Sequence, residues 1–105
     1  MTPQFILLHR PGPTWKDGVP FLEQPGLQGH VDHFREIVAQ GVVLAAGPFL
    51  DAAAGGMVLF RPGVAESRVL EIARSDPTVL SGLLEFELRP WFSAPWAGVL
   101  SSGAG

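Results

Sequence analysis

The sequence predicts a single α+β domain in which four strands form one antiparallel sheet and two helices cover one of its faces. Short apolar runs without polar interruption indicate buried strands, and two segments carry apolar residues at helical spacing. These segments follow one another as strand, helix, strand, strand, helix, strand. At 105 residues, with 47% apolar and 16% charged residues, the chain suits one globular domain with a single core.

The first strand is expected at residues 5–8, an unbroken apolar run flanked by Gln4 and by His9-Arg10. The long segment 11–29 that follows is rich in proline and glycine and is expected to form a loop. It also contains Trp15, Phe21 and Leu22, which give it apolar side chains to pack. Such a loop is either a surface loop pinned by Trp15 or a lid over a pocket.

The first helix is expected from residue 27 or 28 to residue 40, with Gly41 as its C-terminal cap. At about 100° per residue its apolar positions form one stripe, and its charged positions lie on the opposite side. The stripe consists of Leu27, Val31, Phe34, Ile37 and Val38; the charged side holds Asp32, Arg35 and Glu36. His30 falls inside the apolar stripe, which makes it the most unusual local choice in the sequence.

Two further strands are expected at residues 42–46 and 57–60, with a small flexible loop at 51–56 between them. The short connection predicts an antiparallel pair. The second helix is expected at 65–74, because the residue before Pro77 is pushed out of helical geometry. Its inward stripe comprises Ala65, Val69, Ile72 and Ala73. The last strand, 83–91, alternates strictly: Leu84, Phe86 and Leu88 point one way, and Glu85, Glu87 and Arg89 the other.

This β-α-β-β-α-β order is that of ferredoxin-like folds. Two helices cover only one face of the sheet, and strands that are apolar at nearly every position leave the second face apolar too. We therefore expect a homodimer whose sheets face each other, with higher assembly open, and a cleft at the sheet edges. Glu85 and Glu87 would lie near that cleft or at the interface rim. The domain is expected to span 1–92, followed by a tail at 93–105 that adds little beyond docking of Trp96.

Composition excludes several function classes. The net charge of -3 and the absence of a Lys or Arg cluster argue against nucleic-acid binding. The chain has no Cys, which excludes disulfides, zinc-thiolate sites and thiol nucleophiles. No signal peptide is recognised, and the longest apolar run, 42–50, is too short to span a bilayer. A cytoplasmic protein without membrane contact is the expectation.

Three motifs carry a family resemblance. The loop 20–26, PFLEQPG, is followed four residues later by His30; Gly41 is followed by the segment 46–49, AGPF; and the segment 76–83, DPTVLSGL, leads to the closing RPW at 89–91. In this order and spacing the chain resembles the YciI family, also called YCII-related proteins, of the dimeric α+β barrel superfamily. The resemblance implies a dimer and an acid-base pair formed by His30 and Asp76. Such proteins are similar in fold to muconolactone isomerases and related dehalogenases.

The chemistry of such a pair is proton transfer. A histidine titrates near neutral pH, so His30 would act as general base or acid. Asp76 would fix its tautomer or stabilise the imidazolium. The serines of the sequence lie in no nucleophile-elbow context, so isomerisation, elimination or tautomerisation outranks hydrolysis through a covalent intermediate. The expected ligand is a small, partly apolar organic molecule, bound with help from Trp15, Pro48 and Glu85 and without cofactor or metal.

Structural alternatives stand beside these assignments. His30 could be a core histidine bonded to a backbone carbonyl, and Asp76 could cap a turn with Pro77. Trp15 and Trp91 could be core plugs. A metal pair of His30 and His33 lacks a recognisable third ligand.

Two function classes therefore stay open. One is an acid-base enzyme, and the other is a non-catalytic dimer that binds a small molecule or serves as an accessory or structural partner. Titratable side chains converging in a concave cleft would favour the enzyme.

Overall fold

The computed structural model describes residues 2–93. Its elements are β1 (Gln4–Pro11), the 3-10 helix η1 (Phe21–Glu23), α1 (Leu27–Ala39), β2 (Val43–Pro48), β3 (Gly56–Phe60), α2 (Glu66–Arg74), α3 (Pro77–Ser81) and β4 (Leu84–Trp91). The four strands form one antiparallel sheet in the order β2-β3-β1-β4. The predicted ferredoxin-like α+β fold is confirmed, with one more α-helix than expected.

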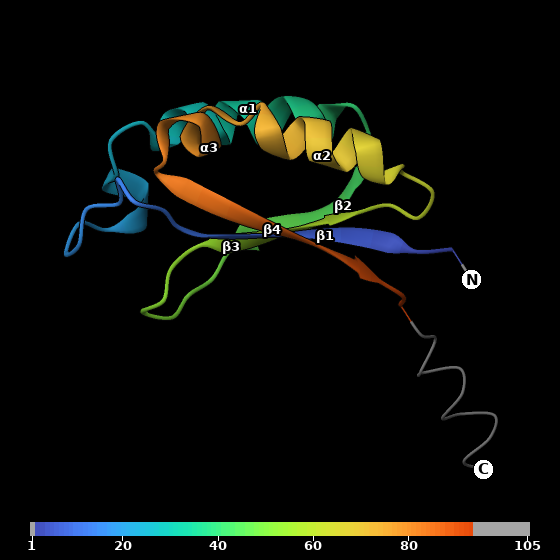
Figure 1. Ribbon diagram of the computed structural model, residues 1–105, viewed down its shortest axis with the longest axis horizontal. Helices are drawn as coiled ribbons and strands as arrows, with labels where there is room; N and C mark the ends of the chain where they lie inside the picture. Colours follow the sequence, from blue (N-terminus) through green and yellow to red (C-terminus); the bar gives the residue numbers. More distant parts are fainter. Residues whose placement is uncertain (1, 94–105) are drawn as a thin grey trace, which may run out of the picture.

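All three α-helices pack on the same face of the sheet (Figure 1). Side chains alternate between the two faces of a strand. On the helix-covered face, Leu7 of β1 pairs with Val58 of β3, and both are buried. From α2, Val69 and Ile72 meet them with at most 1% of their surface exposed. The core therefore lies between the sheet and its helical layer, and it fixes the position of α1 over β2 and β3.

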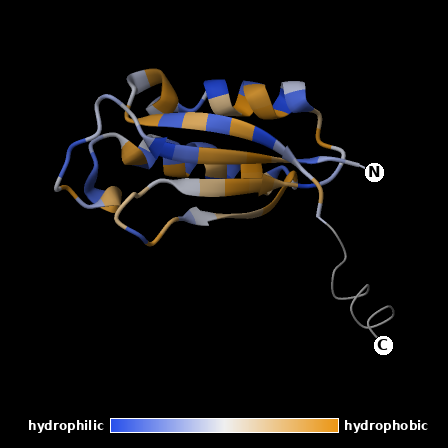
Figure 2. Cartoon of the chain, turned by 60° about the horizontal axis from the view of Figure 1, so that its bottom comes forward, coloured by the Kyte–Doolittle hydropathy of each residue, from blue (hydrophilic) through white to orange (hydrophobic). Residues whose placement is uncertain are grey.

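Within residues 2–93, no helix covers the opposite face of the sheet (Figure 1). Along β1 and β3 the residues on this face are apolar: Ile6 lies opposite Leu59, and Leu8 opposite Met57. Figure 2, which turns this face forward, shows hydrophobic colour through the middle of β1 and alternating colour along β4. The predicted alternation of β4 is confirmed, with Leu84 buried and Glu85, Glu87 and Arg89 exposed.

The predicted elements agree with the structure in type and order, and differ at individual residues. The strand β1 is longer than predicted, at Gln4–Pro11 instead of 5–8. The first helix lies at Leu27–Ala39 as expected, but Val38 in its apolar stripe is 49% exposed. Ala65 is exposed because it precedes α2 as its N-cap instead of belonging to its inward stripe. The strand expected to be buried at 42–46 is β2 at the edge of the sheet, where only Val43 is buried.

Two helical elements were not predicted: the short η1, within the segment expected to be a loop, and α3. Asp76 accepts a hydrogen bond from the Thr78 amide as N-cap, and Pro77 occupies the first turn. The dipeptide that ends α2 therefore also starts a new helix, because both residue types suit a helix N-terminus. The predicted tail at 93–105 and the docking of Trp96 lie beyond Ser93, outside the described residues. Within 2–93, no helix is long and apolar enough to cross a membrane.

Candidate active site

A cavity of about 410 Å³ lies between α1 and the strands β2 and β3, on the helix-covered face. Its wall is mainly apolar and includes Val31, Phe34, Val38, Pro48 and Val58. Phe21 and Leu22 of η1 also line it, as do Arg35, His9 and His30. This cavity lies within one chain, whereas the cleft expected at the edges of two facing sheets would form between two copies.

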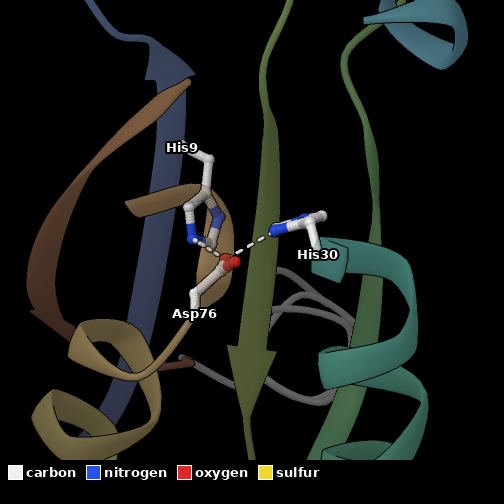
Figure 3. A group of neighbouring side chains, drawn as sticks. All are labelled: His9, His30 and Asp76. Carbon is white, nitrogen blue, oxygen red and sulfur yellow. Dashed lines mark hydrogen bonds and ion pairs between the residues drawn. The ribbon is translucent and has the colours of Figure 1, made fainter. Parts of the chain in front are cut away.

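His30 and Asp76 meet although they are distant in the sequence. His30 lies in the first turns of α1, and Asp76 lies between α2 and α3 (Figure 3). The Nδ1 atom of His30 is 2.6 Å from Oδ2 of Asp76, the length of a charge-assisted hydrogen bond. The Asp76 side chain is fully buried, whereas the His30 side chain retains 17% exposure and borders the cavity. A buried carboxylate thus supports a histidine that a ligand can reach.

The two oxygens of Asp76 have separate partners. Oδ1 accepts hydrogen bonds from the Thr78 amide at 2.9 Å and from the Thr78 hydroxyl at 2.7 Å. Oδ2 is left for His30. Burial raises the pKa of this carboxyl, but the hydrogen bond and charge of His30 and the two bonds from Thr78 outweigh it and lower the pKa below its usual value. Asp76 is therefore both the helix cap considered in the sequence analysis and the partner of His30.

Gly29 allows α1 to approach α3 closely. A Cβ atom at this position would lie 3.1 Å from Cβ of Pro77, tighter than ordinary van der Waals contact. The glycine precedes His30 in the chain and Pro77 follows Asp76. The absence of a side chain at Gly29 therefore permits the close packing of α1 on Pro77, next to the His30–Asp76 pair.

The sequence analysis missed a third member of the site, His9. It lies on β1 with 3% of its surface exposed, and its Nε2 atom is 3.9 Å from Oδ2 of Asp76 (Figure 3). This distance exceeds that of a hydrogen bond, so Nε2 is a buried polar atom without a partner among the described residues. Strand alternation was the available signal, because Phe5, Leu7 and His9 fall on one face.

The surroundings of His9 keep its ring neutral. Burial lowers its pKa to about 4, helped by His30 and His33 and opposed by Asp76. The ring of His30 is perpendicular to that of His9 at 5.0 Å, and Phe34 packs against both. The site therefore contains two imidazoles around one buried carboxylate.

The same three side chains are possible metal donors, since their ligand atoms lie within 4.8 Å of one another. Two ligands bound to one ion at about 2.1 Å stand more than 3 Å apart in tetrahedral geometry. The 2.6 Å between His30 Nδ1 and Asp76 Oδ2 is that of a hydrogen-bonded pair. A cation at this point would have to separate the pair, so the observed spacing suits a shared proton better than a metal ion.

The other residues singled out from the sequence lie in different places. Pro48 borders the cavity. Trp15 packs against Phe21 with ring centroids 5.5 Å apart and planes tilted by 59°, and it does not line the cavity. Glu85 lies away from the cavity on β4, where it pairs with Arg10 at 3.1 Å. The ring nitrogen Nε2 of His33 lies 2.8 Å from the carbonyl oxygen of Ile72. His33, and not His30, thus has a backbone carbonyl as its partner.

One buried glutamine fixes the loop that carries Phe21 and Leu22. The side chain of Gln24 accepts a hydrogen bond from the Lys16 amide at 3.0 Å. It donates hydrogen bonds to the carbonyl oxygens of Lys16 and Val19 at 2.7 and 2.8 Å. The loop is thereby held over one end of the cavity.

Comparison with known proteins places the fold. No family model matches the sequence, and no curated protein matches it. Among solved structures, the chain is similar to a 5-chloro-2-hydroxyhydroquinone dehydrochlorinase from Burkholderia phenoliruptrix AC1100, in complex with 2,5-dihydroxybenzoquinone. The TM-score is 0.55 at 16% sequence identity, over 87% of this chain and 95% of the other. At this identity the likeness shows a shared fold.

Proposed function

We propose that this protein is a small acid-base enzyme that moves a proton on a small, partly apolar organic molecule. One observation carries the proposal: His30 is hydrogen-bonded at 2.6 Å to a fully buried carboxylate and also borders a cavity of about 410 Å³. In that arrangement Asp76 holds the proton of His30 on Nδ1. Nε2 then has a free lone pair and can accept a proton from a ligand.

The reaction class follows from what the site contains. In an elimination, Nε2 of His30 would take a proton from an O–H or C–H bond of the substrate. The electron pair of that bond would form a new π bond, and the leaving group would depart with its own bonding pair. In an isomerisation the same proton would return to another carbon. Asp76 would stabilise the imidazolium formed in between.

The fold and the sequence motifs also support the proposal, separately from the geometry of the site. The solved structure of similar fold is that of a dehydrochlorinase, an enzyme that removes hydrogen chloride. The motifs around His30, Gly47-Pro48 and Asp76-Pro77 support kinship with the YciI family. We further propose that two copies pair through the uncovered apolar face of the sheet, which leaves the cavity on the opposite face open to ligand.

Turnover by three variants tests the proposal. The substrates are chlorinated di- and trihydroxybenzenes, including 5-chloro-2-hydroxyhydroquinone, and small γ-lactones. The readouts are chloride release and incorporation of deuterium from the solvent. We expect His30→Gln and Asp76→Asn to lose a factor of roughly 10² to 10⁴ in rate. His33→Gln is the matched control, because His33 contacts the Ile72 carbonyl instead of Asp76.

Unchanged rates in these variants would contradict the proposal. Equal rates for wild type and His30→Gln across the panel would exclude acid-base catalysis by this pair. A ligand that binds in the cavity but is not turned over would then favour the alternative, a non-catalytic protein that binds a small molecule or assists another enzyme.

A further inference from the structure

His9 is the second titratable side chain in the cavity wall, and the proposed reaction does not use it. Its ring and that of His30 both border the cavity, with centroids 5.0 Å apart. The Nε2 atom of His9 has no hydrogen-bond partner among residues 2–93. A buried polar atom without a hydrogen-bond partner lowers the stability of the fold, so the presence of His9 at this position calls for an explanation.

One carboxylate oxygen sets the tautomers of both rings. Nδ1 of His30 and Nε2 of His9 face Oδ2 of Asp76, at 2.6 and 3.9 Å. A nitrogen lone pair turned toward an anionic oxygen is repelled, whereas an N–H group is attracted. We therefore expect each ring to keep its proton on the nitrogen that faces Asp76. The remaining nitrogens, Nε2 of His30 and Nδ1 of His9, are hydrogen-bond acceptors.

The rest of the cavity offers little competition for a polar ligand atom. Its wall is mainly apolar, and its charged side chain, Arg35, is 74% exposed. Phe34 packs against both histidine rings, at 4.9 and 5.6 Å. Figure 3 shows the second ring nitrogen of His9 turned to the side on which His30 lies. The site thus combines a mainly apolar wall with two nearby acceptors.

We propose that His9 is a substrate-binding residue whose Nδ1 accepts a hydrogen bond from a second hydroxyl group of the substrate, while Nε2 of His30 faces the first. The substrate class is then a small apolar molecule, most simply an aromatic ring, with two hydroxyl donors. This inference rests on the proposed function for the role of His30. A ligand that offers only carbonyl oxygens, such as a simple quinone, presents acceptors to acceptors and is disfavoured.

Binding of matched ligand pairs tests this. The probes are catechol, resorcinol and hydroquinone, each compared with its monomethyl ether, which has one hydroxyl donor fewer. Dissociation constants are measured by calorimetry and by NMR titration at pH 7. For wild type we expect at least one diol to bind about fivefold tighter than its ether, the effect of one neutral hydrogen bond. In His9→Phe, which keeps a ring of similar size, the ratio should fall to about one.

His33→Phe is the matched control and should keep the wild-type ratio, because His33 does not border the cavity. Circular dichroism establishes that the variants fold, and His9→Leu replaces His9→Phe if that ring does not fit. Equal binding of every diol and its ether to wild type overturns the inference without any variant. Retention of the diol preference in His9→Phe or His9→Leu also overturns it.

These outcomes are independent of turnover. If His30→Gln leaves rates unchanged but the diol preference depends on His9, the proposed catalysis fails and the binding role of His9 stands. If rates depend on His30 but the wild type does not distinguish diols from ethers, the proposed catalysis stands and the proposed binding role of His9 fails.

Discussion

Asp76 connects the folding of the chain to its chemistry at the level of a single residue. Its Oδ1 atom caps α3 through Thr78, and its Oδ2 atom orients His30. Because the carboxyl is fully buried and has hydrogen bonds on both oxygens, its orientation is fixed before any ligand arrives. A histidine supported in this way needs no rearrangement to act as a base.

His9 makes stability depend on pH. The unfolded chain protonates this residue below about 6.5, whereas the folded chain keeps it neutral down to about 4. The unfolded state therefore binds more protons in this window, and stability falls as pH falls. The lowered pKa of Asp76 adds a loss at lower pH, below the ordinary value of 3.8.

We expect His9 to remove about 2 kcal/mol of unfolding free energy between pH 7 and pH 5. Urea unfolding of wild type and His9→Phe at both pH values measures this contribution, since the variant lacks the titrating group. Parallel pH dependences of the two proteins would contradict the prediction.

The sequence pattern explains why His30 and Asp76 could be predicted as site residues, whereas His9 could not. His30 interrupts an apolar helical stripe, so it is conspicuous, and the motif around Asp76-Pro77 supplied its partner. His9 follows a strand run that was read as ending at Leu8, whereas β1 continues to Pro11. One extra strand residue decides whether His9 is a flanking polar residue or a buried member of the inner face.

At the level of elements, α1 and α3 determine the geometry of the pair, and the loop 12–26 determines access to it. Two features of these elements do not follow from local pattern: the existence of α3 and the exposure of β2. The helix α3 has only five residues, and its start signal was read as a stop. The strand β2 is apolar in sequence, yet its position at the sheet edge leaves it exposed. Edge position is a property of the whole sheet, and local composition does not reveal it.

Removing the side chain of Gln24 should loosen the loop. In Gln24→Ala, backbone groups of Lys16 and Val19 lose their partners. We expect faster hydrogen exchange of the amides in 16–24 and weaker ligand binding, because Phe21 and Leu22 then lose their fixed position. Gln28→Ala is the control, since the side chain of Gln28 bonds only to Asp32 on the surface. Equal exchange in both variants would show that the loop is held by other contacts.

At the level of the whole molecule, the sheet has two functions on its two faces. One face supports the helices and the cavity, and the other presents the apolar residues Ile6, Leu8, Met57 and Leu59 without a covering helix (Figure 1). The β-α-β-β-α-β order and the apolar second face can be predicted from sequence alone, because each rests on a pattern that extends over many residues. The position of the cavity cannot, since it depends on how far α1 stands from the sheet.

A charge on the uncovered face should break the proposed dimer. Leu8 lies opposite Met57 of β3 and Glu87 of β4, so Leu8→Glu introduces repulsion and an unpaired charge at the interface. Light scattering after size exclusion should give twice the chain mass for wild type and one chain mass for this variant. Leu80→Glu, on exposed α3, should remain dimeric. A monomeric wild type at high micromolar concentration would contradict the proposed assembly.

The most direct test of the central claim is the position of the proton on His30. Long-range proton-nitrogen NMR on protein labelled with ¹⁵N at histidine distinguishes the two tautomers. At neutral pH we expect His30 to bear its proton on Nδ1 and to leave Nε2 bare, and we expect this preference to disappear in Asp76→Ala. A proton on Nε2 in the wild type would leave the cavity without its base and would contradict the acid-base reading of the site.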